Sequence, residues 1–190
     1  MQDLLDRLAP LIGHQPTLLF GVLLTFHVFA GMTCVASGAV AALSPKRRGR
    51  HPVLGGMYFW ALAVVFVTST GMSVLNWSED AYLLVLGTLA FGSALFGRTA
   101  RRQRWPGWTT AHIIGMSASD VVLLTAFYVD NGPRLPLWRE LPTIAFWIGP
   151  TLIGAPIVAR ALARHGRVRR DLRALAQLWH WPVATSTDAR

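Results

Sequence analysis

Long apolar stretches that alternate with short charged linkers constrain this chain more than any other feature. The 190 residues contain five of them, at about 17–43, 54–76, 81–97, 109–128 and 141–159. Each approaches the roughly 20 apolar residues that an α-helix needs to cross the hydrocarbon core of a bilayer. Only 14% of the residues are charged, against about 25% in soluble domains. We therefore predict an all-α integral membrane protein, a bundle of about five transmembrane helices with short loops.

The two ends of the chain have an amphipathic pattern. We predict that the bundle occupies residues 1–165 and that residues 166–190 form a cytoplasmic basic amphipathic tail. Leucines share one helical face near the N-terminus, and Leu172, Leu175 and Trp179 form a similar stripe beside arginines in the tail. Both patterns predict a helix at the membrane surface, the second one bound to anionic lipids or to a partner protein.

Basic residues are distributed unequally between alternate linkers. Of the 18 Lys and Arg residues, 15 lie after the first, third and fifth apolar stretches, and six of the nine acidic residues lie on the opposite side. Cytoplasmic loops carry the excess of basic residues. We expect a bacterial plasma-membrane protein with its N-terminus outside and its C-terminus in the cytoplasm. The net charge of +9 therefore indicates membrane topology rather than nucleic-acid binding.

Two ionisable residues fall well inside the predicted spans, His27 in the first and Asp120 in the fourth. Such residues usually face the bundle interior and have a partner. Counted inward from the outer ends of their helices, both lie at a similar depth of roughly 10–13 Å, near Thr68 and Ser69. These four residues are candidates for a proton or ligand site, and the alternative is a buried pair that only fixes helix packing.

A second pair of histidines lies near the cytoplasmic side. His51 just precedes the second apolar stretch and His112 lies about one turn into the fourth, so the two imidazoles can face each other if the helices are neighbours. Such a pair can bind haem iron axially. Met116 and Asp120 share one helix face with His112. Gly115 and Ser119 flank that face, so either another helix or a flat cofactor can approach it closely. We consider His51, His112 and Met116 candidate cofactor-binding residues, with the two histidines as metal ligands, although His51 is also typical of an ordinary interfacial residue.

Two prolines, Pro150 and Pro156, lie inside the last apolar stretch. Each removes a backbone donor from a helix. Interrupted helices line the binding sites of many transporters, but a simple kink has the same sequence pattern. The only cysteine, Cys34, lies in an apolar run and is expected to pack as a small residue.

The segment 26-FHVFAGMTCVASGAVAALSPKRRGRHPVLGGMYFW resembles a large, uncharacterised bacterial family of predicted multi-pass membrane proteins, a domain of unknown function. The resemblance depends on His27, Gly31, Gly38, Lys46, His51, Gly55 and Tyr58. It continues at 112-HIIGMSASDVVLLTAFYVDNGPRLPLW, where Asp120 replaces a tyrosine expected in the relatives. It implies the fold and the membrane location but no activity.

Several functions are compatible with these patterns. The first is a redox or cofactor-binding protein, with haem b between His51 and His112 and a proton or quinone site at His27. The second is a small proton-coupled carrier centred on His27 and Asp120. A metal-dependent hydrolase that uses His27, His112 and Asp120 also stays open, as does a non-catalytic assembly subunit, so whether the protein is an enzyme is undecided. The partner expected in the membrane is a second copy of the chain or another membrane subunit.

Overall fold

The computed structural model describes residues 18–44, 49–166 and 168–170. These residues form five long α-helices and a short 3-10 helix, with no β-strand among them. The elements are α2 (Leu18–Leu43), α3 (Arg50–Leu75), α4 (Trp77–Gln103), α5 (Trp108–Asn131), η1 (Gly132–Arg134) and α6 (Thr143–Arg164). All five long helices are long and apolar enough to cross a membrane. The predicted all-α, multi-pass membrane fold is therefore confirmed, whereas the N-terminal surface helix and nearly all of the tail lie outside the described residues.

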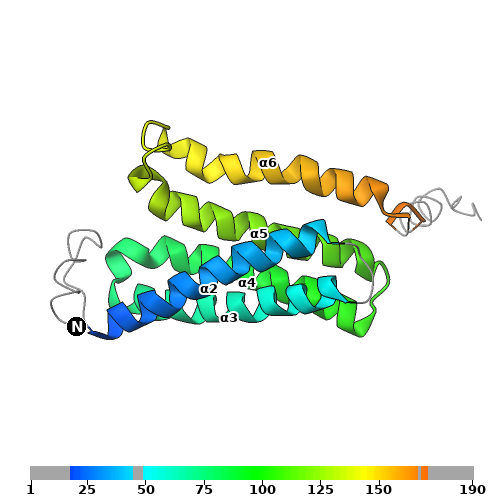
Figure 1. Cartoon of the computed structure of the whole chain (residues 1–190), viewed down its shortest axis with the longest axis horizontal. Helices are drawn as coiled ribbons and strands as arrows, with labels where there is room; N and C mark the ends of the chain where they lie inside the picture. The colour runs from blue at the N-terminus through cyan, green and yellow to red at the C-terminus, as the bar shows by residue number, and fades with distance from the viewer. Residues whose placement is uncertain (1–17, 45–48, 167, 171–190) are drawn as a thin grey trace, which may run out of the picture.

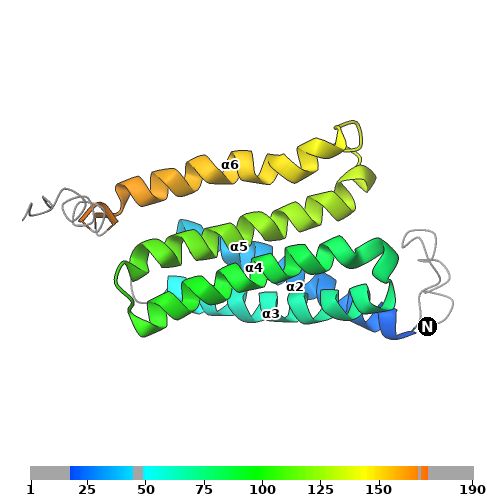
Figure 2. The same ribbon diagram turned by 180° about the vertical axis from the view of Figure 1, so that it is seen from behind.

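Each long helix runs antiparallel to the next one in the sequence and packs against it (Figure 1). This up-and-down arrangement follows from the short connections, which leave a helix no other neighbour to reach. α2, α3, α4 and α5 lie together, and α6 lies outside them along α5 (Figure 2). The molecule is therefore a four-helix unit with one peripheral helix.

The charges divide the bundle into two ends. At one end of the bundle α2, α4 and α6 finish and α3 and α5 begin; we call it the basic end. The described arginines there are Arg50, Arg98, Arg101, Arg102, Arg104, Arg160, Arg164, Arg169 and Arg170. The opposite, acidic end carries Asp80, Asp130 and Glu140. Arginine is favoured in the last turn of a helix, where backbone carbonyls point outward, as at Arg101 and Arg102 of α4.

Tight connections hold the helices in register. A single residue, Asn76, separates α3 from α4, and its side-chain amide donates to a carboxylate oxygen of Asp80 at 3.3 Å. Between α4 and α5, Arg104 and Gly107 both adopt positive φ angles, of 53° and 70°. Glycine adopts that conformation without steric cost, which makes Gly107 suited to the reversal of the chain. Both connections fix the neighbouring helices side by side.

The core lies inside the four-helix unit. A cluster of buried side chains joins α2, α3, α4 and α5: Cys34, Tyr58, Phe59, Leu62, Val65, Ala90, Ala94 and Leu123. The rings of Phe66 and Phe91 stack at 5.2 Å between α3 and α4. Cys34 is fully buried in this cluster, so it packs as the small residue that the sequence predicted.

The outer surfaces of the helices are apolar. Large hydrophobic side chains such as Trp60 of α3 and Leu152 and Ile153 of α6 are about two-thirds exposed, at 65%, 69% and 69%. Phe146 is the only described residue of α6 that is buried. A helix that is apolar on its exposed face is typical of a protein surrounded by lipid.

Candidate functional site

His51 lies in the first turn of α3, at the basic end of the bundle. Its Nδ1 lies 2.9 Å from the carbonyl oxygen of Ala41 in the last turn of α2. A carbonyl only accepts hydrogen bonds, so Nδ1 of His51 carries the proton and donates it. The last four carbonyls of a helix have no partner within that helix, and this bond satisfies one of them. The bond fixes the orientation of the ring relative to α2.

His112 lies in the second turn of α5, at the same end. Its Nδ1 lies 3.0 Å from the carbonyl oxygen of Gly97 in α4, so this ring also donates from Nδ1. The two helices approach very closely here: a Cβ atom on Gly115 would lie 2.7 Å from the Ser93 carbonyl oxygen and 2.8 Å from Cα of Gly97. Only glycine permits this approach, which brings the Gly97 carbonyl within reach of the imidazole.

The structure brings His51 and His112 together. Their ring centroids are 6.5 Å apart, and the ring planes are nearly perpendicular, at 88°. Because Nδ1 of each ring donates to a carbonyl, the lone pair of each imidazole is on Nε2. Histidines that bind metals almost always donate their other ring N–H to a carbonyl, carboxylate or water. Both rings therefore have the supporting bond from Nδ1 that is common among metal-binding histidines.

The immediate surroundings of the pair differ between the two helices. Gly55, one turn after His51 on the same face of α3, has no atom within 4 Å of the place where a Cβ would be. This leaves space beside the His51 ring. On α5 the residue one turn after His112 is Met116, whose side chain packs partly buried against the core cluster. The structure thus gives Met116 a packing contact.

His27 lies in the acidic half of the bundle. Its Nδ1 is 3.1 Å from the hydroxyl oxygen of Thr68 in α3, and that hydroxyl is within donor distance of the Val64 carbonyl, at 2.7 Å. The hydroxyl proton goes to Val64, so its oxygen accepts the proton of His27. Ser69 faces the other way: its hydroxyl donates to Phe66 and lies against Gly87 of α4. Of the two predicted hydroxyl neighbours, only Thr68 contacts His27.

Asp120 lies at a different level from His27. A Cβ atom on Gly38 of α2 would be 3.2 Å from Asp120 Oδ1, so the carboxyl group packs against the α2 backbone at that residue. Gly38 is eleven residues beyond His27, which corresponds to roughly 16 Å along the helix. The expected similar depth is therefore wrong. Depth counted from helix ends assumes parallel helices with level ends, and α2 crosses the other helices obliquely (Figure 1).

The sequence did not indicate the nearest polar neighbours of Asp120. The Tyr58 hydroxyl is 2.7 Å from the Ser119 hydroxyl, in a buried contact between α3 and α5. The Tyr58 ring also lies against Gly38, where a Cβ would approach it to 3.1 Å. A tyrosine in the middle of an apolar run was the available signal, because a buried tyrosine hydroxyl usually has a hydrogen-bond partner.

Arg98 of α4 is another polar residue whose contact the sequence pattern did not indicate. Its guanidinium carbon lies 4.4 Å from the centre of the Phe59 ring, a cation–π contact. It follows Gly97, whose carbonyl supports His112, and it is half-buried near the basic end. The guanidinium of Arg98 therefore packs against α3.

α6 does not line any of these groups. Pro150 and Pro156 lie inside a continuous helix, and among the described elements α6 packs against α5. A broken helix at the centre of a carrier is therefore absent from the described part of the chain. The structure also shows no group of three or more His, Cys, Asp or Glu side chains placed to bind a metal, within the residues it describes. The set His27, His112 and Asp120 is not assembled.

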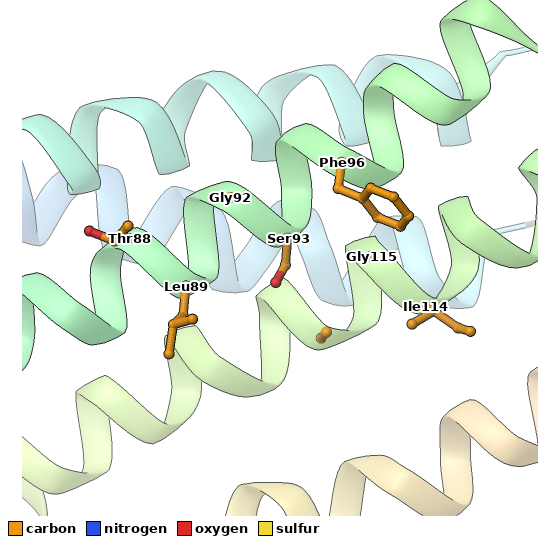
Figure 3. Close-up of a pocket in the computed structure, with 8 residues that line it drawn as sticks. Thr88, Leu89, Gly92, Ser93, Phe96, Ile114 and Gly115 are labelled. Carbon is orange, nitrogen blue, oxygen red and sulfur yellow. The ribbon is translucent and has the colours of Figure 1, made fainter. Parts of the chain in front are cut away.

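One groove lies outside the interior. It follows the contact between α4 and α5, with a volume of about 340 Å³ (Figure 3). Its lining is mostly small or apolar: Thr88, Leu89, Gly92, Ser93, Phe96, Ile114, Gly115 and Ala118. The groove is open to the outside and contains neither histidine, so it is a surface feature of the helix pair.

No protein-family model, curated protein or solved structure matches this chain. The family resemblance seen in the sequence stays a prediction.

Proposed function

We propose that this protein is a membrane electron carrier that binds haem b between His51 and His112. The observation that carries the proposal is the histidine pair, with centroids 6.5 Å apart and each Nδ1 donating to a carbonyl of a neighbouring helix. When bound, haem b would supply one-electron chemistry. The residues of the chain would hold the group, set its orientation and exclude water.

The separation of the rings fits a shared iron. Two imidazoles that bind one metal through Nε2 have centroids roughly 6 Å apart, because a metal–nitrogen bond is about 2 Å and each nitrogen is about 1 Å from its ring centre. The observed 6.5 Å is close to that separation. The space beside Gly55, one turn from His51, favours a flat group over a bare ion.

The supporting hydrogen bonds have a chemical role in this proposal. Donation from Nδ1 to a carbonyl makes an imidazole more basic at Nε2 and prevents it from rotating. Two helices, α2 and α4, supply these carbonyls through Ala41 and Gly97. The ligands are therefore held before any cofactor arrives, which reduces the entropy lost on binding.

His27 would serve a separate step. Its Nδ1 lies against the Thr68 hydroxyl, and the ring lies in the acidic half of the bundle. We assign this group to proton transfer or to hydrogen bonding with a quinone. The competing carrier centred on His27 and Asp120 has less support, because Asp120 meets α2 at Gly38, eleven residues beyond His27.

The orientation in the membrane is part of the proposal. The basic end would face the cytoplasm of a bacterial cell, as the excess of arginines at that end indicates. The haem would then lie close to the cytoplasmic surface. A reporter fused after Arg164 should be cytoplasmic and one placed near Asn131 external; a C-terminus reachable only from outside would reverse the assignment.

The absorption spectrum of protein purified from haem-replete cells tests the function. We expect a Soret band that shifts on reduction with dithionite, and its loss in His51→Ala and in His112→Ala. His27→Ala is the matched control: His27 is also a helix histidine with a bonded Nδ1, yet it lies away from the pair, so its band should persist. Colourless folded protein, or a band that survives loss of His51 and His112, would contradict the proposal.

A further inference from the structure

Among the described acidic residues, Asp120 lies farthest from the ends of its helix. It lies twelve residues after the start of α5 and eleven before its end. Each distance corresponds to roughly 17 Å along the axis, so the residue is near the middle of a hydrocarbon layer about 30 Å thick. Neither end of the helix brings its side chain within reach of bulk water.

The carboxyl group lies where α5 meets α2. Its Oδ1 packs against Gly38, where even one added methyl group would approach to 3.2 Å. α2 packs mainly on α3, and α5 mainly on α4 and α6, so the boundary between α2 and α5 is the least tightly packed side of the four-helix unit. The side chain of Asp120 is accordingly half-buried.

No positive charge compensates this carboxyl group within the described part of the chain. The structure shows no hydrogen bond or ion pair to Asp120 there, and the neighbouring Tyr58 hydroxyl is bonded to Ser119. The titratable groups that face it are Cys34 of α2 and Tyr58 of α3, neither of them cationic. The arginines of α4 and α6 in the described residues lie toward the basic end, and Val121 meets α6 at Gly154.

An isolated carboxylate in such a place has a large desolvation cost. Ionisable groups inside a membrane are expensive unless they are paired or hydrated, and an isolated charge usually becomes neutral instead. None of the described groups around Asp120 carries a positive charge, so a bound proton is what neutralises the carboxylate. A bound proton removes the charge without moving any helix.

We propose that Asp120 is a proton-binding site inside the membrane, neutral at rest and able to release its proton toward the α2–α5 boundary. This site is separate from the histidine pair and does not depend on a bound cofactor. It gives the chain a group that exchanges protons near the middle of the bundle. Asp120 then binds its proton without a direct contact to His27.

Carbodiimide labelling of the full chain in lipid nanodiscs tests this site. The protonated carboxyl oxygen bonds to the central carbon of the carbodiimide while the carboxyl proton moves to its nitrogen, so the reaction requires the neutral acid and has no leaving group. We expect the hydrophobic reagent dicyclohexylcarbodiimide to modify Asp120, as read by peptide mass spectrometry, and a water-soluble carbodiimide with an added amine to leave it unmodified.

Asp130 is the matched control. It lies at the acidic end of α5 and its carboxylate accepts from the Asn131 side chain at 3.2 Å. It should react with the water-soluble reagent. In addition, the infrared band of a protonated carboxyl should be lost in Asp120→Asn and kept in Asp130→Asn. Absence of both the hydrophobic label and this band at neutral pH, or preferential labelling of Asp120 by the water-soluble reagent, would overturn the proposal.

Discussion

The two sides of α5 are built in opposite ways. Toward α4 the backbones nearly touch at Gly97 and Gly115, and the contact places a carbonyl against His112. Toward α2 the helix contributes Asp120, whose carboxyl group meets a glycine and has no hydrogen bond among the described residues. One helix thus presents a supported imidazole near its start and, about two turns later, an acid that has no hydrogen bond among the described residues.

This difference separates two kinds of polar residue in a membrane protein. A side chain that must hold a ligand benefits from a second hydrogen bond that fixes its orientation. A side chain that must change its protonation state benefits from the lack of a strong partner, because a permanent ion pair would hold it charged. The packing around α5 gives His112 a supporting hydrogen bond and leaves Asp120 without one among the described residues.

The largest change in stability is expected from a substitution at the close contact between α5 and α4. Gly115→Ala should destabilise the protein by about 1–3 kcal/mol, because the new methyl group would meet backbone atoms of α4 that cannot rotate away. Thermal unfolding in detergent measures the change. It should also weaken haem retention, since His112 loses its fixed distance to Gly97.

Gly92→Ala is the control for that substitution. Gly92 also lies inside a helix, but no atom is within 4 Å of its would-be Cβ. Alanine favours a helix over glycine by up to about 1 kcal/mol, so this variant should be unchanged or slightly more stable. Equal destabilisation by both variants would mean that the close contact does not determine the α4–α5 packing.

A smaller effect is expected inside the bundle, where Tyr58 bonds Ser119 at 2.7 Å. In a double-mutant cycle, Tyr58→Phe and Ser119→Ala should be sub-additive, with a coupling of about 0.5–1.5 kcal/mol for one buried hydrogen bond. The free energy of unfolding of the four proteins measures it. Strict additivity would show that the hydroxyl groups do not interact.

The smallest coupling is expected between His27 and Asp120. Asp120 meets α2 at Gly38, far along that helix from His27. The changes in the free energy of unfolding caused by His27→Ala and Asp120→Asn should therefore be additive within about 0.5 kcal/mol in the same assay. Asp120→Asn alone should change stability little, since no described ion pair is broken. A coupling as large as that of Tyr58 and Ser119 would place the two residues in contact and favour the carrier.

The helices and their order could be predicted from the sequence because the bilayer sets the length of an apolar span. The meeting of His51 and His112 was foreseeable for a similar reason: both follow a basic linker and begin a helix at the same end. All predicted spans except the first were shorter than the helices, as at α4, which continues through its arginines to Gln103. Charged residues end a membrane span but not a helix.

The remaining geometry could not be predicted from spacing along the chain. The level of Asp120 depends on how far α2 is displaced along its axis relative to α5, which packing determines. The rotation of each helix decides that Thr68 meets His27 while Ser69 faces α4. These offsets arise from contacts such as Gly97 with Gly115, between residues far apart in the sequence.

Electron paramagnetic resonance of the oxidised, purified protein tests most directly whether His51 and His112 bind one iron. Imidazole planes at 88° keep two iron d orbitals close in energy, which gives a strongly anisotropic low-spin ferric signal. We expect that signal in the wild type and in His27→Ala, and its loss in His51→Ala and His112→Ala. A high-spin ferric signal, a rhombic low-spin signal typical of parallel planes, or no iron signal would contradict the proposed ligation.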